Sequence, residues 1–103
     1  MKRAPFLVPV LLRFAGTSAR QDGWGRLLKL TAGGAELSTA VRLTKGEMLS
    51  AHFELGGERL RVAAHVTFVE ADDDGQTRAE LRWADMVERR RLARALVDLL
   101  ARA

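Results

Sequence analysis

The sequence lacks several features that would define a protein class at once. It contains no cysteine among its 103 residues, which excludes a disulfide framework and a thiolate metal site and fits a reducing compartment. Its apolar runs are all shorter than the roughly 18–20 residues of a membrane span. Internal repeats and low-complexity segments are missing as well. We therefore expect a cytoplasmic protein without a membrane span.

The motifs of common catalytic sites are also absent. The chain has no G-x-G-x-x-G, no phosphate-binding P-loop and no outstanding Ser/His/Asp pattern, so we predict no catalytic residues and no enzymatic activity. Its two histidines, His52 and His65, are isolated from any aspartate or cysteine at metal-ligand spacing. We accordingly expect no metal site.

The sequence does contain enough apolar material for one folded domain. Hydrophobic residues make up 48% of the chain, and a chain of this length suits one domain rather than two. The first residues, MKRAPFLVPVLLRF, superficially resemble a signal peptide. Two prolines, strict alternation and the lack of a small-residue cleavage site favour a strand instead. The net charge of +4 is compatible with anionic partners.

Side chains that alternate between apolar and polar indicate β-strands over most of the chain. Turn signals separate these strands, as at Gly56-Gly57, which is typical of a two-residue hairpin. The expected strands begin at Leu7, form both arms of Trp24–Leu37, and cover Met48–Leu55, Glu58–Glu70 and Thr77–Trp83. The alternation points four aromatic residues inward: Phe14, Phe53, Phe68 and Trp83.

The last part of the chain changes to a helical period. Asp85, with Glu88 three residues later, is typical of a helix start. Apolar residues then recur on one helical face, at Leu92, Leu96, Leu99, Leu100 and Ala103. We predict an all-β small antiparallel barrel of about six strands with one C-terminal α-helix. The single domain would comprise a basic arm (residues 1–6), the barrel (7–84) and the helix (86–102).

The stretch Trp24–Leu37 combines a regular strand phase with a glycine pair. Residues two apart share one face of a strand, so Leu28 and Leu30 are expected to face the core. The outer face would then carry Leu27, Lys29 and Thr31. Gly33-Gly34 is expected to form a tight turn with positive φ.

Within this stretch, the run Lys29–Gly34 (KLTAGG) resembles the second signature of the PilZ domain, a bacterial cyclic di-GMP receptor module. That signature reads Asp or Asn, any residue, Ser, any two residues, Gly. Here Gly34 keeps the glycine, Thr31 replaces the serine and Lys29 replaces the acid or amide. The family's first signature, two arginines separated by three residues, precedes the first strand. Here it keeps Arg3 but has Leu7 as its second member.

The resemblance implies a signalling module with a degenerate nucleotide site. In the family, the arginines grip guanine edges and phosphates, and the Asp or Asn accepts hydrogen bonds from the ligand. The positions that would carry the remaining ligand contacts are Arg3, Lys29, Thr31 and Gly34. Because Lys29 has only donors, cyclic di-GMP binding is expected to be weak or lost, and no cofactor is assigned. The implied function is an adaptor that contacts a protein partner or associates with itself.

The candidate partner surface is Leu27, which would be an exposed apolar residue beside Lys29. Two alternatives stay open: a functional cyclic di-GMP receptor, and a small basic nucleic-acid-binding barrel. An arginine-rich helix supports the second, with Arg89, Arg90, Arg91, Arg94 and Arg102. The expected lack of an outward aromatic platform argues against it, although the orientation of Phe6 and Trp24 is left open.

Overall fold

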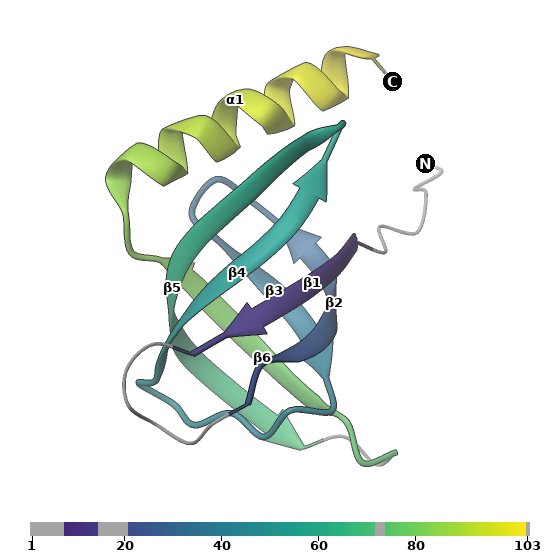
Figure 1. Ribbon diagram of the computed structural model, residues 1–103, viewed down its shortest axis with the longest axis vertical. Helices are drawn as coiled ribbons and strands as arrows, with labels where there is room; N and C mark the ends of the chain where they lie inside the picture. The colour runs from purple at the N-terminus through teal and green to yellow at the C-terminus, as the bar shows by residue number, and fades with distance from the viewer. Residues whose placement is uncertain (1–7, 15–20, 72–73, 103) are drawn as a thin grey trace.

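The described part of the chain, residues 8–14, 21–71 and 74–102, forms a closed barrel of six antiparallel strands with one helix across an end (Figure 1). The structure is a computed structural model, in which the side chains of residues 100 and 102 are also left undescribed. The strand order around the barrel is β1-β2-β3-β6-β5-β4. The elements are β1 (Val8–Arg13), β2 (Gly23–Leu30), β3 (Gly34–Thr39), β4 (Met48–Leu55), β5 (Glu58–Ala71), β6 (Thr77–Trp83) and α1 (Met86–Arg102). The predicted fold class is confirmed.

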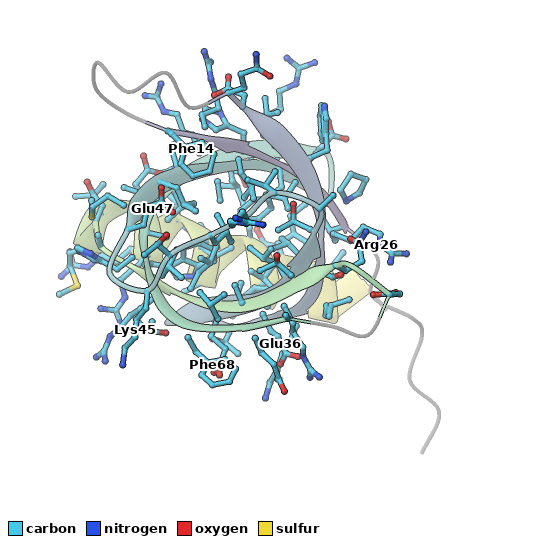
Figure 2. All side chains as sticks on the ribbon, turned by 90° about the horizontal axis from the view of Figure 1, so that it is seen from below. Phe14, Arg26, Glu36, Lys45, Glu47 and Phe68 are labelled. Atoms are coloured by element: carbon cyan, nitrogen blue, oxygen red, sulfur yellow. The ribbon has the colours of Figure 1, made fainter. Side chains whose placement is uncertain are left out.

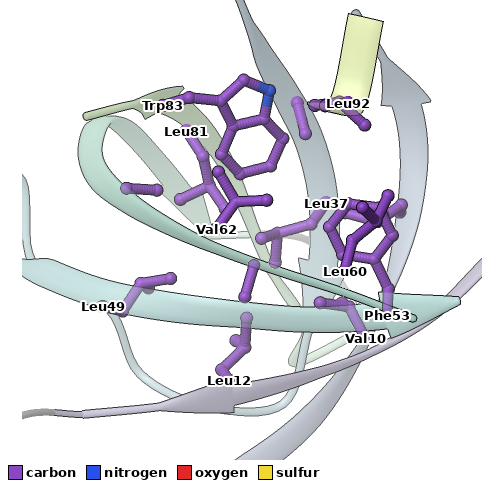
Figure 3. Packing of buried hydrophobic residues seen from close by; sticks show 14 of the residues in the cluster. Val10, Leu12, Leu37, Leu49, Phe53, Leu60, Val62, Leu81, Trp83 and Leu92 are labelled. Atoms are coloured by element: carbon purple, nitrogen blue, oxygen red, sulfur yellow. The ribbon is translucent and has the colours of Figure 1, made fainter. Parts of the chain in front are cut away.

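Alternate residues of the strands fill the interior (Figure 3), and α1 covers one end of the barrel (Figure 1). Phe53 from β4 and Trp83 from β6 stack in this core with their ring centroids 6.2 Å apart. Leu92 of α1 is fully buried in the same cluster. Burial of such side chains is the main favourable term in folding, so the helix is part of the domain's stability.

The helix begins where the sequence predicts. Asp85 Oδ1 accepts from the backbone N–H groups of Val87, at 2.8 Å, and Glu88, at 3.1 Å. These N–H groups have no carbonyl partner inside the helix. The predicted apolar face is confirmed for the side chains that are described, because Leu92 is buried and Leu96 and Leu99 pack half-buried against the core. Leu100 and Ala103 lie outside the described side chains.

β4 and β6 keep a strict alternation and confirm the predicted core positions, apart from Thr77, which is half-buried. The buried side chains are Leu49, Ala51, Phe53 and Leu55 on β4 and Ala79, Leu81 and Trp83 on β6. The predicted two-residue hairpin between β4 and β5 is also present. Gly56 and Gly57 have φ values of 59° and 84° and connect the paired residues Leu55 and Glu58, and such positive values favour glycine.

A β-bulge inverts the predicted phase in the middle of β2. The pairing of β2 with β3 shifts between Leu27 and Lys29, so one extra residue on β2 restarts the alternation. Leu27 is fully buried, whereas Leu28 is 37% exposed. The predicted inward position of Leu28 and outward position of Leu27 are therefore wrong. Leu30, which follows the bulge, packs against the core as predicted.

A second bulge changes the orientation of Phe68. The pairing of β5 with β6 shifts between Val66 and Phe68, so Val66 is buried and Phe68 is 44% exposed. Figure 2 shows Phe68 and Glu36 projecting from the same side of the barrel, away from its interior. The predicted inward position of Phe68 is wrong. The other three aromatic residues face the core as predicted, with Phe14 half-buried against it.

Candidate functional site

The hydroxyl of Thr31 closes the turn between β2 and β3. It donates to the carbonyl of Gly34 at 3.1 Å, and it accepts from the backbone N–H groups of Gly33 at 3.3 Å and Gly34 at 3.1 Å. A hydroxyl has one donor and two acceptor lone pairs, and this turn uses all three. The side chain that matches the serine of the signature therefore has a local structural role.

The turn is also fixed to the barrel core through Trp83, whose side chain is 2% exposed. The backbone N–H of Trp83 donates to the Gly33 carbonyl at 3.0 Å, and its indole Nε1 donates to the Thr31 carbonyl at 3.1 Å. Hydrogen bonds from a buried aromatic side chain hold the turn in one position. The signature residues therefore lie on a rigid part of the surface.

Gly34 is required for a reason other than the predicted one. Among the glycines that the structure describes, those with positive φ are Gly46, Gly56, Gly57 and Gly75, so the predicted positive φ at Gly33-Gly34 is wrong. A Cβ at Gly34 would overlap the carbonyl oxygen of Leu81 on β6, whereas a Cβ at Gly33 would come no closer than 3.9 Å to Arg89. The close approach of β3 to β6 explains the glycine.

A pocket of about 190 Å³ lies beside this turn. It brings together three of the predicted ligand residues, Lys29, Thr31 and Gly34. Glu36 and Glu80 line it too, so two carboxylates lie near one lysine. Glu36 pairs with Arg78, whose Nε lies 2.6 Å from Oε1. The pocket is smaller than the roughly 300–1,000 Å³ of most ligand sites, and the negative charge of Glu80 opposes the approach of phosphate groups.

The remaining predicted site residues are Arg3 and Leu27, of which only Leu27 belongs to the described part of the chain. Arg3 and Leu7, the two positions of the first signature, lie outside the described residues. Leu27 is fully buried, because it precedes the bulge and shares the inward phase of Gly23 and Gly25. The prediction that Leu27 forms an exposed partner surface is therefore wrong.

A larger groove, of about 770 Å³, lies elsewhere on the molecule and was missed by sequence reasoning. The strands contribute Pro9, Leu11, Trp24, His52, Arg59 and Arg61, and α1 contributes Glu88 and Arg91. We term it the Trp24 groove, because the Trp24 side chain is 64% exposed there. The one local signal was a large aromatic residue between two glycines, Gly23 and Gly25, at the start of a strand.

One titratable side chain of the groove, His52, has a lowered pKa. Burial lowers the pKa of His52 from its ordinary value of 6.5, and the positive charges of Arg13 and Arg61 lower it further. Asp22 acts in the opposite direction. The imidazole therefore stays neutral to lower pH than a free histidine. Among the described residues, no group of three or more His, Asp or Glu side chains is arranged to hold a metal ion.

The fold and the glycine turn define a barrel-and-helix domain with a candidate ligand pocket at the β2–β3 turn. The family model of the PilZ domain matches residues 2–101, so the chain belongs to the PilZ domain family. PilZ domains are binding modules of cyclic di-GMP-linked signalling. No curated protein matches the chain. No helix within the described ranges is long and apolar enough to cross a membrane.

Solved structures of other proteins share this fold. The PilZ domain of CeSA from a cellulose-synthesizing bacterium is 24% identical with a TM-score of 0.67, and the alignment covers 98% of this chain and 99% of that one. The PilZ domain of YcgR from Escherichia coli with c-di-GMP is 16% identical, with a TM-score of 0.69 and coverage of 93% and 83%. MrkH of K. pneumonia in its apo state is 16% identical, with a TM-score of 0.72 and coverage of 99% and 53%.

Proposed function

We propose that this PilZ domain is a protein–protein adaptor in cyclic di-GMP-linked regulation in the cytoplasm, with weak or lost affinity for cyclic di-GMP itself. The proposal rests on the pocket and the hydrogen bonds of the β2–β3 turn. Its pocket is small, Glu36 and Glu80 line it, and the Thr31 hydroxyl already makes its full set of hydrogen bonds.

The sequence departures act in the same direction. Lys29 stands where the family has an acceptor and Leu7 stands where it has its second arginine. Each lost charge-assisted contact costs about 1.5–3 kcal/mol. Two such losses weaken binding by about two to four orders of magnitude. A module that no longer holds its nucleotide still offers its surface to a protein.

The experiment is a calorimetric titration of the protein with cyclic di-GMP. We expect no binding at low micromolar concentration, while the PilZ domain of E. coli YcgR serves as the positive control. The double variant Leu7→Arg with Lys29→Asp should regain measurable affinity, because it restores one guanidinium and one acceptor. Tight binding by the unchanged protein would overturn the proposal.

The nucleic-acid alternative has weaker support. Two aromatic side chains face outward: Trp24, whose orientation the sequence left open, and Phe68, which was predicted to face inward. However, β2 and β5 are three strands apart in either direction around the closed barrel, so these two residues lie on opposite sides of it. Separated rings do not make the continuous stacking track that single-stranded nucleic acid uses. We therefore retain the adaptor role.

A further inference from the structure

The floor of the Trp24 groove is apolar, and the described residues leave it exposed. Trp24 is 64% exposed, Pro9 is exposed and Leu11 is half-buried. Trp24 and Leu11 are direct partners in the pairing of β1 with β2, so their side chains lie side by side on the barrel exterior. A contiguous apolar patch with a polar rim is typical of a contact surface.

The outward position of Trp24 is imposed by its neighbours. A Cβ at Gly23 would overlap the Val41 side chain, and a Cβ at Gly25 would lie 2.9 Å from the Ser38 carbonyl oxygen. There is consequently no room inside the barrel for a side chain on either side of Trp24. The Trp24 carbonyl also accepts from the Thr39 hydroxyl at 2.8 Å. The indole is thus carried on a fixed backbone, as an interface anchor requires.

The rim of the groove carries an excess of positive charge. Arg59 and Arg61 line it together with Glu54 and Glu88, and the third arginine, Arg91, is balanced by Glu58, with 3.1 Å between Nη2 and Oε1. Arg26 adds another cation, since it pairs with Pro9 across β1 and β2. Arg13 is balanced by Asp22, with 3.0 Å between Nε and Oδ2. A positive rim favours a negatively charged partner and disfavours a second copy presenting the same face.

The strand pairing limits how a partner can attach. Every described strand is paired on both sides in the closed barrel, so no sheet edge is open for an added strand. A partner must therefore dock through side chains. The groove offers an aromatic surface for an apolar side chain and guanidinium groups for carboxylates.

We propose that the Trp24 groove is the docking site for an acidic protein segment that places an apolar side chain against Trp24. This proposal rests on the adaptor function and names its binding surface and the chemistry of its partner. The site lies apart from the pocket at the β2–β3 turn, since no residue lines both. The two proposals can therefore fail separately.

The test uses short fluorescein-labelled peptides in which glutamates flank a central Leu-Phe pair. Two matched peptides replace the glutamates by lysines or the Leu-Phe pair by serines. We expect the first peptide alone to raise anisotropy with the whole protein and to shift the protein's tryptophan emission to the blue. Trp83 is already buried at 2% exposure, so the emission change reports Trp24.

Variants then locate the contact. Trp24→Ala should weaken peptide binding by at least about tenfold, and the double variant Arg59→Glu with Arg61→Glu should abolish it. Phe68→Ala is the matched control, because it removes an exposed aromatic side chain from the opposite side of the barrel and should bind like the unchanged protein. Circular dichroism melting checks that every variant folds.

Each other outcome has a definite meaning. Equal binding by Trp24→Ala, equal binding of the lysine peptide, or no binding of any peptide would overturn the docking site. The Trp24 emission could instead be blue in the free protein and shift to the red on dilution or on removal of residues 1–6. That result would overturn the proposal of an acidic partner, because the chain itself would fill the groove. Tight cyclic di-GMP binding would instead contradict the adaptor proposal and leave the peptide result standing.

Discussion

The two candidate surfaces of this PilZ domain use their residues in different ways. At the β2–β3 turn, the residues that match the family signature serve the fold. Thr31 closes the turn with its hydroxyl and Gly34 allows β3 to approach β6. In the Trp24 groove, Trp24 and Leu11 leave apolar surface exposed that the fold does not use.

This difference separates a sequence motif from an available binding surface. A motif residue whose hydrogen bonds are all internal offers little to a ligand, whatever family it matches. An exposed aromatic side chain on a fixed backbone differs, because a partner that buries it gains the free energy of that burial. Changes that affect stability at one surface and association at the other would establish the contrast.

The largest effect is expected at Leu27, which lies on β2 between the two surfaces and points inward. Leu27→Asp would bury an unpaired carboxylate, which costs about 3–5 kcal/mol against a total stability of roughly 5–15 kcal/mol for a small domain. Thermal melting followed by circular dichroism should show a melting temperature lowered by more than about 10 °C.

The matched control is Leu28→Asp, one residue further along β2. Because Leu28 is 37% exposed, this change should cost less than about 1 kcal/mol. A stable Leu27→Asp together with an unfolded Leu28→Asp would mean that the bulge lies elsewhere and that Leu27 belongs to the surface.

The next effect is expected at the close contact between β3 and β6. Gly34→Ala should destabilise the domain by about 1–3 kcal/mol, because the added methyl group meets the Leu81 carbonyl oxygen and the backbone must move. Gly33→Ala, with open space at its Cβ, should stay within about 0.5 kcal/mol of the unchanged protein. Urea unfolding measures both, and equal costs would remove the packing explanation for the glycine.

A smaller effect is expected from the hydroxyl of Thr31. Thr31→Val keeps the shape of the side chain but removes its hydrogen bonds, at a cost of about 0.5–1.5 kcal/mol. Thr31→Ser keeps the hydroxyl and should be closer to the unchanged protein in the same urea experiment. If Thr31→Val were as stable as Thr31→Ser, the hydroxyl would be free for a ligand and the contrast between the two surfaces would weaken.

The orientation of residues could be predicted wherever strand pairing is regular. β4 and β6 have one consistent phase, and their predicted core positions are buried except for Thr77 at the start of β6, which is half-buried. In β2, the run Leu27-Leu28-Lys29-Leu30 fits either phase, because leucines occupy both faces. The extra residue of a bulge is defined only against the partner strand, and the same holds for Phe68 on β5. Local alternation could not detect either one.

The candidate sites show the same limit. The motif found Lys29, Thr31 and Gly34, which are close in sequence and line one pocket. Glu80, which changes the charge of that pocket, comes from β6 through the pairing of Glu36 with Glu80. The Trp24 groove combines residues from four strands and the helix. Such a surface depends on long-range strand order, which a single sequence does not contain in readable form.

The smallest effect is expected from His52 in the Trp24 groove. Burial and the nearby Arg13 and Arg61 lower its pKa below 6.5, so the unfolded chain takes up the proton first as the pH falls. His52 therefore contributes stability above about pH 6.5 that is lost as the pH drops through its lowered pKa. Because His52 is only partly buried, solvent screening keeps this contribution small.

The measurement compares the urea midpoint at about pH 7.5 and about pH 5. The unchanged protein should lose more stability on acidification than His52→Gln, since glutamine does not titrate. An identical loss for His52→Gln and the unchanged protein would show that the groove does not perturb this imidazole. The positive potential of the groove rim would then be too weak to act on His52, which lies within the groove, and too weak to attract an acidic segment.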